Sequence, residues 1–422
     1  MVMGQGFADR HLTSEEVGRT VHEGLATLAV DGKRVLIIIP DGTRTMPMPL
    51  MFDLFERDLF PRVAALDYLV ALGTHPLMDD EHLGKLVGRQ VVDGRVGKIR
   101  IFNHHWEKPE SFVTLGVIPA KEIGEITGGV VEKEIPVRLN KMILNYDQII
   151  ICGPVFPHEV VGFSGGNKYF FPGIGGSEII NQTHWTGALM TNYKIIGAGY
   201  TPVRAIIDRA AEMIDRPVAC FALVVTHGGF EGLYFGTAKE AWKAASELSA
   251  RKHIIYVKKP FRRVLSVMPT LYDDLWTGAK GMYKMEPAVA DGGEVVIYAP
   301  HITEVSYTHG KIIEEIGYHC RDYFLAQWDK FKHFPGGVLA HSTHVKGLGK
   351  YDAATGTETP RIQVTLATGI SKERCRRINL GYLDPASVNM EEWKGREEEG
   401  VLLVPRAGEM LYRVEERVSK AA

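Results

Sequence analysis

The sequence VLIIIPDGTR, residues 35–44, decides the fold class of this chain. Five consecutive branched aliphatic residues are typical of a strand that is buried on both faces, and such strands occur in parallel sheets covered by helices. Further apolar runs occupy residues 68–72, 99–102 and 148–151, and a helix-like pattern at 79–87 separates two of them. We therefore expect an α/β domain with a largely parallel sheet.

The same alternation continues along the rest of the chain. A basic stretch at 252–263, interrupted by Pro260, separates an earlier set of elements from a later one. The earlier set ends with a helix at 202–214, a strand at 220–225 and a helix at 238–250, and the later set comprises strands at 264–267, 294–298, 363–366 and 401–404 and helices at 311–316 and 321–331. We predict two α/β domains, residues 1–258 and 259–422, each with a largely parallel or mixed sheet flanked by helices and with the active site in the cleft between them.

Composition and charge favour small molecules as partners. Of the 422 residues, 45% are hydrophobic and 24% are charged, and the formal net charge is −2. A near-neutral chain has no electrostatic attraction for nucleic acid or for an anionic membrane surface. We expect a small-molecule ligand, association with further copies of the same chain, and neither nucleic acid nor membrane as a partner.

Cysteine usage is typical of a reducing compartment. No Cys-x-x-Cys pair occurs, and the four scattered cysteines are expected to be free, buried thiols (Cys152, Cys220, Cys320 and Cys375). Residues 1–10 contain no apolar run, and no later segment approaches the length of a membrane-spanning helix. These features predict a cytoplasmic protein.

Polar residues follow each of the first four predicted strands. The sequences are DGTR at 41–44, GTHP at 73–76 and NHHW at 103–106, and the fourth strand leads to a loop that contains His158. Ligands of parallel sheets bind at the carboxyl ends of the strands, and these ends lie at one edge. Polar groups from distant parts of the chain are therefore predicted to gather there.

The loop after the fourth strand is dense in glycine and places Lys168 between two histidines, His158 and His184. Its sequence GFSGGNK, followed by Tyr169, lacks the spacing of a Walker A loop, which removes the main support for ATP hydrolysis. A glycine loop with a lysine also suits a non-catalytic protein that binds a nucleotide or a phosphorylated sugar. A zinc hydrolase that uses the histidines at 104, 105, 158 and 184 is a further alternative, although His-Glu-x-x-His is absent.

Taken together, the motifs resemble the lactate racemase family, whose members use a nickel-pincer nucleotide. The resemblance covers roughly residues 30–300 and is densest at 156–184. It is carried by the Asp-x-Thr-Arg turn at 41–44, the Gly-Thr-His-Pro turn at 73–76, Asn103-His104, and the run from His158 through Lys168 to His184. This implies an isomerase that inverts a hydroxy acid.

The resemblance assigns the cofactor to a few residues. It implies that Lys168 holds the cofactor, a nickel pyridinium-3,5-bisthiocarboxylic acid mononucleotide, through a covalent thioamide, and that His184 binds the nickel. An imidazole suits a square-planar nickel whose other donors are sulfur, carbon and sulfur. Further cofactor contacts are expected from Asp41, Thr43, Gly165 and Gly166. Other enzymes must make this cofactor, so loading depends on them.

Proton transfer is assigned to two histidines. The resemblance implies that His104 and His158 are the acid/base pair and that Arg44 stabilises charge on the substrate oxygen. His104 is preferred to its neighbour His105 because its interval to the next apolar strand agrees with the family. Imidazole suits both roles because both of its protonation states are accessible near neutral pH.

The later domain resembles the family's substrate-contacting segment less closely. Lys280 matches the lysine that contacts the substrate carboxylate, and Trp276 and Thr277 are expected to contact substrate where lactate-specific members carry tyrosine and glutamine. Gly42 and Asn167 also replace a histidine and an arginine of the family pattern. These departures predict a hydroxy acid larger or more polar than lactate, such as a sugar acid.

Overall fold

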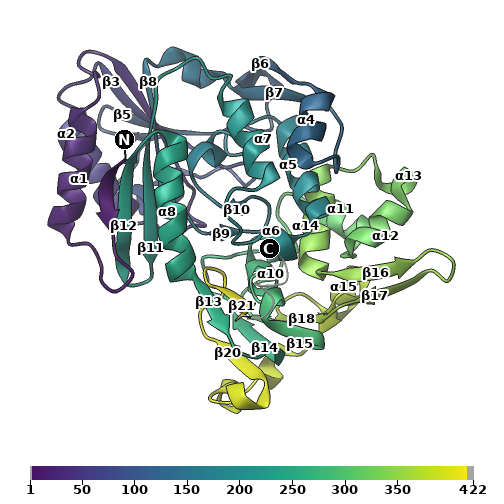
Figure 1. Cartoon of the computed structure of the whole chain (residues 1–422). Helices are drawn as coiled ribbons and strands as arrows, with labels where there is room; N and C mark the ends of the chain where they lie inside the picture. Colours follow the sequence, from purple (N-terminus) through teal and green to yellow (C-terminus); the bar gives the residue numbers. More distant parts are fainter. Residues whose placement is uncertain (1, 416–422) are drawn as a thin grey trace. The chain divides into compact units, whose positions relative to one another are not determined.

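The computed structural model describes residues 2–415, which form two compact units (Figure 1). Within these residues, the first unit contains 2–156, 163–180 and 204–252, and the second contains 157–162, 181–203 and 253–415. Two short segments from the N-terminal part of the chain therefore belong to the second unit. The division into domains 1–258 and 259–422 and the location of the active site between them stay predictions.

An eight-stranded sheet lies at the centre of the first unit, with the strand order β1-β12-β11-β8-β2-β3-β5-β4. Its strands span Met3–Gly6 (β1), Arg34–Ile39 (β2), Ala65–Val70 (β3), Arg95–Val96 (β4), Ile99–Asn103 (β5), Gln148–Pro154 (β8), Val218–Thr226 (β11) and Gly229–Gly236 (β12). The neighbours β11, β8, β2, β3 and β5 run parallel, whereas β1, β12 and β4 are paired antiparallel. The predicted α/β class with a largely parallel sheet is confirmed.

Helices cover both faces of this sheet (Figure 1). The helices of the first unit span Ser14–Ala26 (α1), Met48–Leu59 (α2), Asp80–Val87 (α3), Ala120–Thr127 (α4), Pro202–Ala211 (α7) and Ala238–His253 (α8). Gly24 of α1 approaches the ring of Phe235, whereas Leu248 of α8 packs against Gly232, which belongs to the opposite face of β12 because strand residues alternate. Burial from both sides explains why residues 35–39 of β2 are apolar without interruption.

One antiparallel ribbon of the first unit escapes prediction from the sequence. It consists of β6 (Phe112–Ile118) and β7 (Ile135–Asn140), whose register shifts between Thr114 and Gly116. Such an irregularity breaks the alternation of apolar and polar residues by which a half-buried strand is recognised. The last residue of β7 is Asn140, and its side chain contacts the predicted acid/base residue His104.

A five-stranded parallel sheet, in the order β19-β18-β15-β14-β20, lies in the second unit. Its strands span Phe261–Val267 (β14), Val289–Ala299 (β15), Gln363–Thr368 (β18), Gly381–Tyr382 (β19) and Val401–Val404 (β20). Shorter strands span Pro157–His158 (β9), Gly162–Phe163 (β10), Ile254–Val257 (β13), Gly349–Asp352 (β16), Thr357–Pro360 (β17) and Leu411–Val414 (β21). The sheet predicted for the later part of the chain is therefore present.

The remaining helices span Ser177–Met190 (α5), Asn192–Ile195 (α6), Leu275–Gly278 (α9), Lys280–Tyr283 (α10), Gly310–Ile316 (α11), Arg321–Ala326 (α12), Trp328–Phe331 (α13), Gly336–Lys346 (α14) and Lys372–Arg377 (α15). The prediction of one helix at 321–331 is wrong. Gln327, with φ −122° and ψ 33°, leaves the helical conformation and separates α12 from α13.

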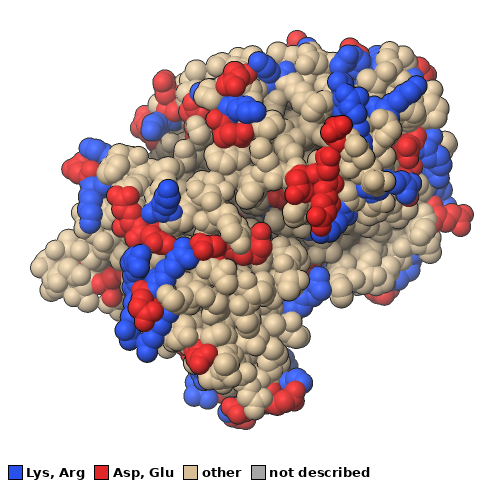
Figure 2. Space-filling view, turned by 180° about the vertical axis from the view of Figure 1, so that it is seen from behind, with Lys and Arg blue, Asp and Glu red and all other residues tan. Residues whose placement is uncertain are grey.

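The distribution of surface charge and the state of the cysteines are those expected from the amino-acid composition. Lysine and arginine are interspersed with aspartate and glutamate on the face shown in Figure 2, so no large field of one sign forms there. All four cysteines are buried and free, as predicted. Among residues 2–415, no helix is both long and apolar enough to cross a membrane.

Candidate active site

The polar ends of β2 and β3 meet at one edge of the first unit's sheet, as predicted. His75 Nδ1 forms a short contact with Asp41 Oδ2, and Asp41 Oδ1 accepts hydrogen bonds from Thr43 N at 3.1 Å and Thr43 Oγ1 at 2.6 Å. Arg44 donates to Thr43 Oγ1 at 2.7 Å. Burial alone would raise the pKa of Asp41, but the charges of His75 and Arg44 and the hydrogen bonds outweigh it and lower that pKa. Asp41 therefore stays ionised and orders the turn that carries Arg44.

His104 follows β5 and is fully buried in the first unit. Its Nδ1 lies 3.0 Å from Asn140 Nδ2, and its ring contacts the edge of Phe112 at a centroid distance of 5.5 Å. No described residue is a hydrogen-bond partner of its Nε2. Burial lowers the pKa of His104 to about 4, an effect that the Gly175 backbone only partly opposes. The ring is therefore neutral at physiological pH.

His105 has a different environment. Its side chain is 39% exposed and its Nδ1 pairs with Glu107 Oε1 at 2.8 Å. The structure thus places one of the two neighbours in the interior and the other in a surface ion pair. This difference supports the choice of His104 as the acid/base residue, which stays a prediction.

The loop that carries Lys168 is fixed from within the first unit. The buried guanidinium of Arg204 donates to the carbonyl groups of Gly165, at 2.9 Å, and Phe163, and the indole of Trp242 donates to Ser164 O at 2.9 Å. Lys168 itself lies on a 3-10 helix, Gly166–Tyr169. The sequence gives no sign that Arg204, some 40 residues away, organises this loop.

The two loop glycines allow close packing of the backbone. A Cβ atom on Gly165 would lie 2.6 Å from Val155 Cγ2, and one on Gly166 would lie 2.9 Å from Trp242 Cβ. Both glycines also have positive φ angles, 82° and 58°. Packing therefore explains both glycines, and their contacts to a cofactor stay predictions.

In the second unit, α14 lies beside the part of α5 that begins at Asn181. Gly337 N donates to Asn181 Oδ1 at 3.0 Å, and a Cβ on Gly336 would lie 2.6 Å from Asn181 O, so the two backbones approach closely. One turn further along, His184 of α5 and His341 of α14 are near enough for their charges to interact. Burial first, and then neighbouring positive charge, lowers the pKa of His341 far below its ordinary value. His341 is therefore a neutral ring beside the predicted nickel ligand.

His158 also belongs to the second unit, and its segment lies against the C-terminal half of α5. Its Nδ1 accepts a hydrogen bond from Val160 N at 3.1 Å and lies 3.4 Å from Glu159 Oε2. A Cβ on Gly187 would lie 3.0 Å from Val160 O, which shows how closely this segment approaches α5. Two of the predicted histidines, His158 and His184, are thus held by adjoining backbone segments of one unit.

Trp276 is at the centre of an aromatic cluster in the second unit. The ring of His341 stacks on it at 4.0 Å, and that of His309 lies 4.5 Å away. Lys280 Nζ lies 4.5 Å from the centre of the Tyr272 ring and donates to Thr277 O at 3.4 Å. The structure brings the predicted pair Trp276 and Lys280 into one region together with His309, which the sequence suggests as a polar contact for a longer substrate, and adds His341, which the sequence does not indicate.

Thr277 has a structural task in this region. Its backbone N and its hydroxyl both donate to Asp274 Oδ1 at 2.9 Å, which caps the start of α9. Burial raises the pKa of Asp274, although these hydrogen bonds oppose it. The Thr277 hydroxyl already donates to Asp274, so a predicted contact of Thr277 with a substrate would have to form while this hydrogen bond is kept.

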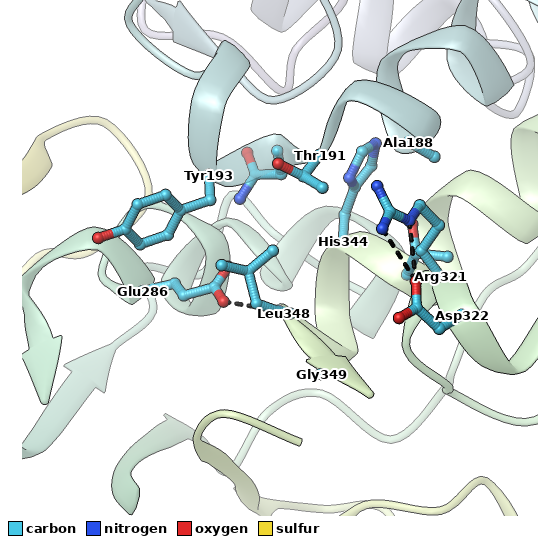
Figure 3. Close-up of a pocket in the computed structure, with 12 residues that line it drawn as sticks. Ala188, Thr191, Tyr193, Glu286, Arg321, Asp322, His344, Leu348 and Gly349 are labelled. Atoms are coloured by element: carbon cyan, nitrogen blue, oxygen red, sulfur yellow. Dashed lines mark hydrogen bonds and ion pairs between the residues drawn. The ribbon is translucent and has the colours of Figure 1, made fainter. Parts of the chain in front are cut away.

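A separate cavity of about 30 Å³ lies within the second unit (Figure 3). Asn192, Glu286 and His344 line it, and burial raises the pKa of the Glu286 carboxyl. Asn192 Oδ1 and His344 Nε2 find no hydrogen-bond partner among residues 2–415. Such a space suits ordered water, and none of the predicted site residues lines it.

Residues 2–415 contain no group of three or more His, Cys, Asp or Glu side chains that could hold a metal ion. The zinc hydrolase alternative stays a hypothesis.

Comparisons with known proteins agree with the motifs. Residues 19–195 match the lactate racemase N-terminal domain. The chain is 23% identical over 282 residues to lactate racemase of Thermoanaerobacterium thermosaccharolyticum, a match that spans 65% of this chain and 62% of that protein.

Two solved structures are also similar. A protein from Thermotoga maritima is 33% identical, with a TM-score of 0.89 over 96% of this chain and 99% of the other. The lactate racemase apoprotein of T. thermosaccharolyticum is 17% identical, with a TM-score of 0.69 over 97% and 94% of the two chains, and it supports the fold alone. The family model, the curated relative and the shared fold lead to one conclusion: residues 19–195 are a lactate racemase N-terminal domain, and the chain has the fold of lactate racemase.

Proposed function

We propose that this protein is a racemase or epimerase of a 2-hydroxy acid. The observation that carries the proposal is the match of residues 19–195 to the lactate racemase N-terminal domain, because this range contains the residues with predicted catalytic and cofactor roles, Arg44, His104, His158, Lys168 and His184. The reaction would invert the carbon that bears the hydroxyl group through a planar ketone. A non-catalytic protein that binds a nucleotide or a phosphorylated sugar would not need the acid/base histidines, His104 and His158.

The cofactor that we propose is the nickel-pincer nucleotide. Lys168 would hold it covalently, and His184 would be the protein ligand of the nickel. The donor set is compatible with this group, because a nickel ion that takes its other donors from an organic ring needs one imidazole and no cluster of protein ligands. When bound, the cofactor would supply a pyridinium carbon that accepts hydride and returns it.

The protein itself would move protons and stabilise charge. As hydride leaves the substrate carbon, the hydroxyl proton must pass to a base, and after hydride returns to the opposite face the new alkoxide needs a proton donor. We assign these tasks to His158 and His104. The buried Nε2 of His104 supports the assignment, because a buried polar atom without a protein partner is ready to bind a ligand. Arg44 would stabilise negative charge on the substrate oxygen.

We propose a substrate that is larger or more polar than lactate. Lys280 would bind its carboxylate, and Trp276 with its two histidine neighbours would contact the rest of the molecule. A substrate hydroxyl that finds a buried partner contributes about 1 kcal/mol, and a partner that lactate leaves unpaired costs about 1–3 kcal/mol. Discrimination on the order of ten- to several-hundred-fold follows. A sugar acid fits this description.

The test uses protein that is produced together with the enzymes that make the cofactor. Isomer formation from lactate, malate, phenyllactate and aldonic or uronic acids is followed by NMR in deuterated water and by chiral separation. We expect a polar, longer acid to turn over at least tenfold better than lactate. Equal or better turnover of lactate would refute the substrate proposal, and no turnover of any hydroxy acid by fully loaded protein would refute the activity.

A further inference from the structure

The environment of His104 fixes which of its nitrogens carries a proton. Asn140 Nδ2 lies 3.0 Å from His104 Nδ1, and Asn140 Oδ1 accepts a hydrogen bond from Met142 N at 3.1 Å. A backbone N–H only donates, so the atom that faces Met142 must be the amide oxygen. The amide nitrogen therefore faces the imidazole.

The amide nitrogen also only donates. His104 Nδ1 must consequently accept, because a proton there would oppose the N–H group of Asn140. A neutral imidazole that accepts at Nδ1 carries its proton on Nε2. That Nε2 is buried and makes no hydrogen bond to residues 2–415, although the Gly175 backbone is near enough to the ring to raise its pKa. The N–H group at Nε2 therefore has no protein acceptor.

We propose that Asn140 is a positioning residue that holds neutral His104 with its proton on Nε2, so that this ring presents a hydrogen-bond donor to the substrate oxygen in the direction of reaction in which His158 takes the hydroxyl proton. The catalytic meaning rests on the proposed function, whereas the position of the proton rests on contacts within the first unit. Asn140 lies at the end of β7, and its amide links the turn to Met142 with His104. The ribbon β6–β7 therefore has a role in orienting this ring.

His158 also faces a donor at Nδ1. Val160 N donates to His158 Nδ1 at 3.1 Å, and the Glu159 carboxylate lies 3.4 Å from the same nitrogen. At both histidines an N–H group therefore faces Nδ1, from a side-chain amide at His104 and from the backbone at His158. The donor at His104 belongs to a side chain, so substitution of Asn140 can test it.

Nitrogen-15 NMR of the histidine side chains measures the proton position directly, since protonated and unprotonated ring nitrogens have separate chemical shifts. The full chain is labelled at histidine, without cofactor, and the His104 signals are identified by their loss in His104→Gln. We expect a neutral ring at pH 7 with an unprotonated Nδ1 and a protonated Nε2. A proton on Nδ1 would overturn the proposal.

Asn140→Asp tests the contact itself. The aspartate keeps an oxygen for Met142 N but replaces the donor that faces His104 by an acceptor, so the proton should move to Nδ1 and the imidazole should titrate at higher pH. Asn145→Asp adds the same charge to the adjoining 3-10 helix, Lys141–Asn145, and should leave the His104 signals unchanged. An unchanged proton position in Asn140→Asp would contradict the role of Asn140.

In cofactor-loaded enzyme, Asn140→Asp should lower kcat on the order of 100-fold, with a smaller change in KM, and should change the pH profile. Asn145→Asp should behave like the unchanged chain. The outcomes separate the two proposals. An active enzyme whose His104 carries its proton on Nδ1 refutes this inference alone, whereas loaded protein without turnover refutes the proposed function even if the proton lies on Nε2.

Discussion

The imidazole of His341 stacks on the indole of Trp276, with ring centroids 4.0 Å apart and planes inclined by 27°. The two residues are 65 positions apart in the chain, and α14 brings them together. Burial opposes a charge on His341 and keeps the ring neutral, and its Nε2 lies 3.4 Å from the Tyr318 hydroxyl. The stack therefore joins Trp276 to a neutral, buried imidazole.

Trp276→Tyr should shift the substrate preference toward lactate. The smaller ring loses part of the stack with His341 and restores the residue that lactate-specific relatives are expected to carry. We predict that the ratio of kcat/KM for lactate to that for the best larger acid rises about tenfold. Trp393→Tyr, in the core of the second unit, is the matched control and should leave the ratio unchanged. An unchanged ratio in Trp276→Tyr would show that Trp276 does not contact the substrate.

Metal binding and proton transfer should separate in two variants of the second unit. His184→Ala, produced with the cofactor-making enzymes, should lose most of its nickel, because the proposed ligand is gone. His158→Ala should keep its nickel and lose turnover by about 100-fold or more, as expected for the loss of a general base. Elemental analysis and activity are measured on the same preparations. Equal nickel loss in both variants would indicate that His158 is a ligand instead.

Acidification should destabilise the first unit through His104. The folded-state pKa is about 4, below the ordinary value of 6.5, so the unfolded chain binds a proton that the folded chain excludes. Stability is therefore full above pH 6.5 and falls as the pH drops toward 4, by an amount on the order of 3 kcal/mol. Denaturant unfolding of the cofactor-free chain at pH 7.5 and pH 4.5 measures this loss. His104→Gln should show a smaller loss, and an equal loss in His105→Gln and His104→Gln would contradict the assignment.

Gly166→Ala should weaken the loop that carries Lys168. The new Cβ would lie 2.9 Å from Trp242 Cβ, at a φ of 58° that non-glycine residues rarely adopt. We predict a loss of about 1–3 kcal/mol in the free energy of unfolding. Gly199→Ala, where a Cβ meets no atom within 4 Å and φ is not positive, should change it by less than about 0.5 kcal/mol. Similar effects of the two substitutions would show that the loop tolerates a side chain at 166.

Much of the first unit follows from the sequence because its central strands are apolar on both faces. The runs at 35–39 and 148–151 become β2 and β8, and their neighbours end at the same edge. The contact between Asp41 and His75 follows from that edge. Local pattern alone is sufficient for such strands.

Other site features depend on contacts between distant residues, and local pattern does not reveal them. Asn140 reaches His104 across 36 positions, and Arg204 reaches Gly165 across 39. His341 looks like an ordinary polar residue until the fold places it beside Trp276. Side-chain pairing of this kind is decided by tertiary packing.

The covalent attachment at Lys168 is the central claim, and the intact mass of the protein tests it most directly. The unchanged chain and Lys243→Ala, an exposed control on α8, should both carry the mass of the nickel-pincer nucleotide when they are produced with the enzymes that make it. Lys168→Ala should carry none and should have almost no activity. An adduct and turnover that both survive in Lys168→Ala would contradict the account.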